Sequence, residues 1–336
     1  MKHVFCSAFI GLALSATLFA DPIQLSGYSQ VGATNEGQKA VFLVNSKYTL
    51  PMGDFVKGKM DLEVNQGLEF RALTVTGYLT PDTTLTVGKS IEKWGAIDLL
   101  RGVDAINPLD LRSPGRRELE SVRLPLGITK ITQLVGPIQW DTVMVHEFRN
   151  NKTDPDQVSI QPYNDEWSNP GWGTRLRGDL SGVDIELSYL DHLATQRVHR
   201  TGLSAQIPFG DKTLKVEYVM DETETVAAGG TDWYIDSSQT LIAEVSQRTD
   251  LTKTLPNTTF WIGTYQWNSD DDKLHFSATY SDNDFLGGYQ KYTLSYDVAD
   301  DVTMMIGGLT YRNGRDILGQ ATKYADTVFA QVVYQF

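Results

Sequence analysis

Cysteine is almost absent from the chain. Cys6 is the only cysteine among 336 residues, and it lies in an apolar run near the N-terminus. A single cysteine cannot form a disulfide within the chain, so a disulfide framework is excluded. Backbone hydrogen bonds and side-chain packing must therefore hold the fold together.

Long apolar runs are missing beyond residue 20. A membrane-spanning helix needs about twenty consecutive apolar residues, and residues 21–336 contain no such segment. In lipid, only helices and closed barrels satisfy every backbone polar group. If the chain lies in a membrane, we therefore expect it to cross the membrane as strands.

Basic residues are outnumbered by acidic ones. The chain has 29 Lys and Arg against 42 Asp and Glu, which gives a formal net charge of −13. This balance argues against nucleic-acid binding, which uses a concentrated basic surface. The sequence also lacks a phosphate loop, a dinucleotide fingerprint and a nucleophile elbow, and its histidines lack metal-ligand spacing. We therefore expect neither a cofactor nor a metal ion.

Residues 1–20 have the features of a secretory signal. Lys2 and His3 precede a short apolar run, and Ala20 stands directly before an Asp-Pro pair. A basic start, a short apolar stretch and a small residue before the cleavage point are typical of cleavable signal peptides. We expect a signal peptide at 1–20 and a single domain, without a lipidated N-terminus, at 21–336.

The last thirteen residues, 324–336, alternate between two faces. One face is wholly apolar and consists of Val328, Ala330, Val332, Tyr334 and Phe336. Strands place alternate side chains on opposite faces, and transmembrane barrels turn the apolar face outward. The ending resembles the C-terminal signal of bacterial outer-membrane β-barrels, so we expect Phe336, Tyr334 and Val332 to form the barrel-insertion signal. A strand of a soluble β-sandwich is the alternative.

The rest of the mature chain consists of short alternating segments separated by Gly, Asp, Asn and Pro. Such segments indicate strands, and bacterial single-chain barrels have even strand numbers. We predict an all-β fold, a single antiparallel transmembrane β-barrel of about 16 strands, with 14 and 18 as alternatives. Besides the C-terminal strand and a weak segment near 226–237, the expected strands are residues 24–34, 39–49, 55–65, 68–79, 83–92, 121–135, 138–148, 172–180, 182–193, 197–208, 212–221, 239–248, 257–268, 272–282, 287–297 and 301–312.

The connections between these segments differ in length. Pairs such as Gly136-Pro137, Ser181-Gly182 and Gly210-Asp211 indicate tight turns, whereas 149–171 and 313–323 are long. Short turns on one rim and long loops on the other are typical of outer-membrane barrels. We therefore expect both termini to face the periplasm on the rim with short turns.

Residues 87–112 form the most informative internal stretch. They run through Trp94-Gly95, Asp98, Asp104 and Asn107-Pro108 to Asp110. The stretch resembles a signature of a largely uncharacterised, porin-like group of outer-membrane barrels, in which Gly-Lys/Arg, Trp-Gly, Asp and Asp-x-x-Asn-Pro-x-Asp follow one another. The resemblance covers about residues 70–125. It implies a barrel in the outer membrane of a Gram-negative bacterium that exports or takes up lipid-like or small organic molecules, and it supplies no substrate.

The loop 93–120 is long and rich in charge. A loop of this length without secondary structure is uncommon unless it is functional or disordered, and its apolar residues argue against disorder. We expect it to fold into the lumen and constrict the pore. The candidate constriction residues are Lys89, Lys93, Arg101, Arg112, Arg116, Arg117 and Arg123, with Asp98, Asp104 and Asp110 as their partners. Alternatively, these charges form only a salt-bridge network that fastens the loop.

The function predicted from these features is passage of small solutes through an outer-membrane channel, with selectivity set by the charged loop. Expected partners are outer-membrane lipid and lipopolysaccharide, the barrel-assembly machinery and small solutes, while the oligomeric state stays open. The alternative function is a non-conducting accessory barrel in an export or lipid-traffic system.

A remote alternative is a lipid hydrolase embedded in the barrel. His275 and Ser277 resemble in spacing the His-x-Ser pair of lipid A deacylases, and Glu244 is a candidate third group. A nucleophile needs its base within hydrogen-bond reach and a third group that orients the base. Because two-residue motifs arise often by chance, we do not expect an enzyme.

Overall fold

The computed structural model describes residues 24–34, 41–51, 56–64, 68–100, 102–103, 105–109, 122–147, 170–193, 197–253, 256–283, 287–313 and 326–335. No helix in these ranges is long and apolar enough to cross a membrane. The strands are β1 (Gln24–Thr34), β2 (Val41–Pro51), β3 (Val56–Val64), β4 (Leu68–Thr80), β5 (Thr83–Ser90), β6 (Leu126–Val135), β7 (Ile138–Val145), β8 (Gly171–Leu180), β9 (Val183–Leu193), β10 (Arg197–Phe209), β11 (Lys212–Met220), β12 (Glu224–Tyr234), β13 (Gln239–Asp250), β14 (Thr258–Asn268), β15 (Leu274–Asn283), β16 (Gly287–Ala299), β17 (Val302–Asn313) and β18 (Thr327–Gln335). The signal peptide predicted at 1–20 lies outside the described residues.

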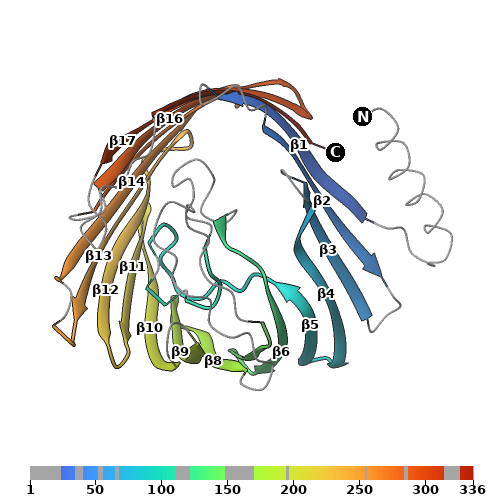
Figure 1. Ribbon diagram of the computed structural model, residues 1–336, viewed down its shortest axis with the longest axis vertical. Coiled ribbons are helices and arrows are strands. Elements are labelled where there is room, and N and C mark those ends of the chain that lie inside the picture. Colours follow the sequence, from blue (N-terminus) through green and yellow to red (C-terminus); the bar gives the residue numbers. More distant parts are fainter. Residues whose placement is uncertain are drawn as a thin grey trace.

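All of these strands belong to one antiparallel sheet in which sequence neighbours pair. The first strand also pairs with the last, since β1 and β18 share a register that sets Val31 opposite Val332. Figure 1 shows the strands arranged around a central space. The predicted antiparallel barrel is thus confirmed, and the described residues form 18 strands, at the upper end of the predicted range and above the favoured number.

The strand that sequence reasoning undervalued is β12. The run from Ala227 through Gly230 consists of small residues, so the apolar alternation is weak there. The inner face requires this at Gly230, because an added Cβ would lie 2.8 Å from Cγ of Glu244 on the neighbouring strand. Because the Glu244 side chain packs closely here, β12 has a glycine at this position, and the alternation of apolar and polar residues by which strands are recognised is weak.

The two faces of the sheet differ in chemistry. On β11, Val216 and Tyr218 are each 48% exposed, whereas the alternating residues Lys215 and Glu217 are 3% and 4% exposed. The same alternation holds on β18, where Val328, Val332 and Tyr334 are exposed on one face. The predicted apolar outer face of the C-terminal strand is confirmed for these residues, and Phe336 lies outside the described residues.

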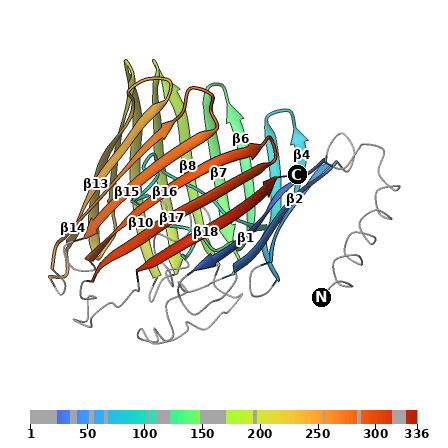
Figure 2. The same ribbon diagram turned by 90° about the horizontal axis from the view of Figure 1, so that it is seen from above.

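The connections at the two rims differ as expected. The turns 81–82, 136–137, 181–182, 210–211 and 300–301 each join an even-numbered strand to the next odd-numbered one. The opposite rim carries the long connections 91–125 and 146–170. Because the number of strands is even, the start of β1 and the end of β18 lie at the rim with the short turns. Figure 2 shows the tilted strands side by side between these rims.

Candidate functional site

The connection between β5 and β6 turns into the barrel. Figure 1 shows this segment, coloured cyan to teal, within the ring of strands. Trp94, Val103 and Ile106 are at most 6% exposed and pack in one cluster with residues of the inner wall. Ile97 and Leu100 pack against Ile262 of β14 in a second cluster. The described part of the predicted loop 93–120 therefore lies in the lumen, with an apolar core of its own.

Glu217 of β11 holds the middle of this loop. Its Oε1 accepts hydrogen bonds from the backbone N–H groups of Ala96 at 2.5 Å and Ile97 at 2.8 Å. Its Oε2 accepts one from the N–H of Val103 at 3.0 Å. One ionised carboxylate thus satisfies three N–H groups that have no helix or sheet partner.

Two further glutamates act in the same way on neighbouring pieces of the loop. The carboxylate of Glu244 on β13 accepts hydrogen bonds from the N–H groups of Asp98, Leu99 and Leu100 at 2.7–2.8 Å. The carboxylate of Glu186 on β9 accepts one from the N–H of Gly95 at 2.9 Å. We call Glu186, Glu217 and Glu244 the glutamate cradle. Together they fix seven consecutive or nearby amides against the wall.

Two glycines let the loop approach the cradle. An added Cβ on Gly95 would lie 2.2 Å from Oε1 of Glu217, and one on Gly102 would lie 2.5 Å from Oε2. The φ angle of Gly95 is also +92°, a backbone conformation that residues other than glycine rarely adopt. Both glycines are therefore needed where backbone and carboxylate meet.

Charged side chains add a second set of contacts between loop and wall. Lys215 of β11 forms ion pairs with Asp98 of the loop and with Asp232 of β12. Nζ of Lys93 lies 2.5 Å from Oδ1 of Asp98. Burial alone would raise the pKa of Asp98, but the hydrogen bonds from Lys215 and Lys93 outweigh it and hold that pKa below its usual value.

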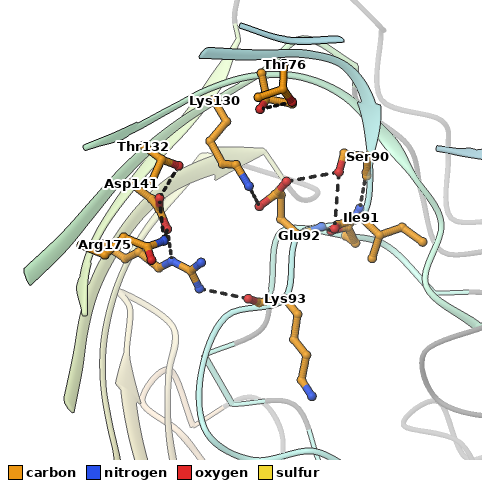
Figure 3. Close-up of polar contacts among 12 residues, drawn as sticks. Thr76, Ser90, Ile91, Glu92, Lys93, Lys130, Thr132, Asp141 and Arg175 are labelled. Carbon is orange, nitrogen blue, oxygen red and sulfur yellow. Dashed lines mark hydrogen bonds and ion pairs between the residues drawn. The ribbon is translucent and has the colours of Figure 1, made fainter. Parts of the chain in front are cut away.

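The beginning of the loop is tied to β6, β7 and β8 (Figure 3). Arg175 donates to the Asp141 carboxylate at 2.7 Å and to the carbonyl oxygen of Lys93 at 3.0 Å. Its guanidinium also lies 5.4 Å from the centroid of the Trp94 ring. Lys130 pairs with Glu92 at 2.9 Å. These contacts fix the point at which the chain leaves the strand, and Trp94, 1% exposed, packs against the inner wall.

Asn107 closes the far side of the loop. Its Oδ1 accepts from the N–H of Glu92 at 2.7 Å, and its Nδ2 donates to the carbonyl oxygen of Leu124 at 2.8 Å. The side chain is 1% exposed. The Asn107 amide thus ties both ends of the loop together.

The predicted constriction residues do not all lie in the lumen. Lys93 and Asp98 meet in the lumen, and Arg123, 3% exposed, lies where residue 123 forms a bridge with Leu109. Lys89 is a correction to the prediction. It stands opposite Leu73, which is exposed on the outer face, and it pairs with Glu147 at 3.4 Å, so it points away from the lumen. The remaining candidates lie outside the described residues, namely Arg101, Asp104, Asp110, Arg112, Arg116 and Arg117.

The residues that hold the loop were missed by the sequence reasoning. Glu186, Glu217, Arg175 and Lys215 were not candidates, and Glu244 was considered only as a third group of a hydrolase. The signal that could have found them is their position in the alternation: each is a charged residue on the inner face of a strand whose other face is apolar. The sequence does not show which of the many inner charges the loop reaches.

The suggested hydrolase pair is not assembled. Both ring nitrogens of His275 have other partners, since Nδ1 lies 2.9 Å from Oδ1 of Asn268 and Nε2 lies 3.1 Å from Oδ2 of Asp297. Ser277 stands opposite Gln266 and Thr293 on the adjacent strands. Glu244, the suggested third group, binds loop amides instead.

Comparisons with known proteins find likeness only at the level of structure. No protein-family model matches the chain, and no curated protein sequence is detectably similar. Solved structures that match include OccAB2 of Acinetobacter baumannii, with TM-score 0.62 at 10% identity, and OccK5 (OpdH) of Pseudomonas aeruginosa, with 0.61 at 11%. The outer membrane channel DcaP of Acinetobacter baumannii matches with TM-score 0.53 at 11% identity. Each match covers 94% of this chain and 97% of the other. The chain therefore has a β-barrel fold that an outer-membrane channel also has.

Proposed function

We propose that the protein is an outer-membrane channel for small solutes and that its inward loop sets selectivity. The observation that carries the proposal is the glutamate cradle, which fixes a loop inside the barrel through seven backbone hydrogen bonds. A rigid obstruction in the lumen narrows the path, and the charges on it act on passing ions. The likeness to DcaP, itself an outer membrane channel, supports the proposal at the level of fold.

The outer face supports a position in the membrane. Large apolar side chains such as Leu203, Val245, Tyr292 and Ile306 are 45–58% exposed on separate strands, as lipid-facing residues of barrels are. Contact with lipid and lipopolysaccharide, and recognition of Tyr334 and Val332 by the barrel-assembly machinery, belong to the same proposal.

Lys93 and Asp98 are the loop charges that act on solutes. Their side chains are 39% and 38% exposed, although they pair with one another. Asp98 has a second partner in Lys215, which is 3% exposed. Replacing Lys93 therefore leaves Asp98 ionised and held in place, and adds one net negative charge to the lumen surface of the loop.

Reversal potentials in planar bilayers test the proposal. With refolded protein in a salt gradient, Lys93→Gln should shift the reversal potential toward cation selectivity. Lys273→Gln is the matched control, because Lys273 lies in an exposed turn at the rim. Equal reversal potentials for both variants would leave the loop charges with a fastening role alone. Absence of channel steps in the unmodified protein would favour the accessory barrel instead.

A further inference from the structure

A cavity lies between the start of the loop and the inner wall. It measures about 540 Å³ and is bounded by the loop at Lys93, Gly95 and Ala96, and by side chains of β7 to β10. The turn residue Pro137 also lines it, so it lies toward the rim with the short turns. A molecule that passes the loop would therefore meet this cavity.

The strand register fixes the order of polar groups on the cavity wall. At one level, Gln139, Arg177, Glu186 and Ser204 stand opposite one another on β7 to β10. The next level toward the short turns holds Asp179, Asp184 and Gln206. Two residues along a strand span about 6.6 Å, so the backbone position that carries Arg177 lies one such step from the level that carries Asp179 and Asp184.

Several charged groups around the cavity already have ion-pair partners. Arg175 pairs with Asp141 and Glu186, and Lys93 pairs with Asp98. Each of these groups therefore already has a partner within the protein.

Three other charges are left for a ligand. Arg177 donates to the neutral amide oxygen of Gln139 at 3.0 Å, and it has no ion pair among the described residues. Asp179 accepts one hydrogen bond, from the N–H of Gly182 at 3.0 Å. Asp184 is exposed, and no hydrogen bond or ion pair to it occurs within the described part of the chain. The accessible face of the cavity therefore presents one positive group beside two negative groups.

We propose that this cavity binds small zwitterions, with the anionic group at Arg177 and the ammonium group at Asp179 and Asp184. The inference rests on the proposed function in that the ligand is a transported solute. A simple anion is attracted by Arg177 and repelled by the two neighbouring carboxylates, and a simple cation meets the reverse arrangement. Only a solute with both charges is attracted by Arg177 and by the two carboxylates, because each of its groups meets an opposite charge.

A ligand-observed NMR titration of the detergent-solubilised full chain tests the proposal without requiring conductance. β-Alanine is the zwitterion, while propionate and ethylammonium each carry one of its charges. We expect β-alanine to bind at least about fivefold more tightly than either ion. Binding of propionate or ethylammonium as tight as that of β-alanine, or tighter binding of glucose, would overturn the proposal.

Variants assign the two charges separately. Arg177→Gln should weaken β-alanine binding about fivefold and make ethylammonium the better of the two ions, whereas Asp184→Asn should weaken it and favour propionate. Asp301→Asn, in the exposed turn between β16 and β17, is the control and should bind as the unmodified chain does. Heat-dependent gel mobility establishes that each variant folds. Conductance is recorded separately: a conducting channel without zwitterion preference refutes this inference alone, and binding without conductance refutes only the channel.

Discussion

Replacing Glu217 by Gln should loosen the inward loop while leaving the barrel intact. Both carboxylate oxygens of Glu217 accept backbone N–H groups, two at Oε1 and one at Oε2. A glutamine side chain has one acceptor oxygen and one NH₂ group that only donates. In its better orientation the amide oxygen keeps Ala96 and Ile97, and the NH₂ group then faces the N–H of Val103.

The energetic effect follows from this contact. Loss of a hydrogen bond to a charged acceptor costs roughly 1.5–3 kcal/mol, and a buried donor without a partner adds about 1–3 kcal/mol. Allowing for partial relaxation, we expect a penalty of roughly 2–4 kcal/mol for the docked loop. That corresponds to a shift of about 30- to 700-fold in the equilibrium between docked and released loop. The sheet itself is unaffected, because its ladder consists of backbone bonds between strands.

Hydrogen exchange and single-channel recording measure this release. In Glu217→Gln, the amides of Ala96, Ile97 and Val103 should exchange faster, and the conductance should rise or fluctuate because the obstruction moves. Glu222→Gln is the control, since it removes the same charge from an exposed rim residue. If exchange at these three amides and the conductance both match those of the control, the cradle does not hold the loop.

Three further outcomes are expected. Gly102→Ala should release the loop as Glu217→Gln does, because the added Cβ would lie 2.5 Å from the Glu217 carboxylate. Gly229→Ala, whose added Cβ meets nothing nearer than 3.8 Å, should not release it, and hydrogen exchange measures both outcomes. Burial would raise the pKa of Asp221, but hydrogen bonds from a threonine and an arginine lower it to about 2. The ion pair of Asp221 with Arg200 therefore stabilises the rim above about pH 4 and is lost as the pH falls through 2. Asp221→Asn should accordingly lower the thermal unfolding temperature at pH 7 but not below pH 2. Val332→Lys on the outer face should lower the free energy of unfolding in liposomes by up to about 2–4 kcal/mol, the cost of a lysine at mid-membrane, whereas Gln331→Lys on the inner face should not lower it.

The barrel could be predicted because most strands alternate cleanly. On β18 and β11 the exposed face is apolar and the inner face carries the polar groups, so each strand is recognised by itself. The position of Lys89 was also readable, since it shares a face with Leu85 and Val87 of the same strand. β12 was recognised only as a weak segment because it has small residues where Glu244 crosses the inner face.

The loop could be predicted only in part. Its length and its apolar residues indicated that it folds inward, and two of the candidate residues, Lys93 and Asp98, form an ion pair. The partners on the wall were not predictable, because they depend on which strands lie beside the loop. That information comes from the register between strands distant in sequence, for example the separation of 121 residues between Ala96 and Glu217.

The cradle has a geometric logic that single residues do not reveal. Glu186, Glu217 and Glu244 stand on β9, β11 and β13, which are alternate strands of the wall. Glu186 holds residue 95, Glu217 holds residues 96–97 and 103, and Glu244 holds residues 98–100. The loop therefore runs from β9 past β11 to β13 and then returns to β11. The loop bends at residues 95–96 and 98–100, so its amides have no helix or sheet partner there, and carboxylates of the wall replace the partners that a sheet would have supplied.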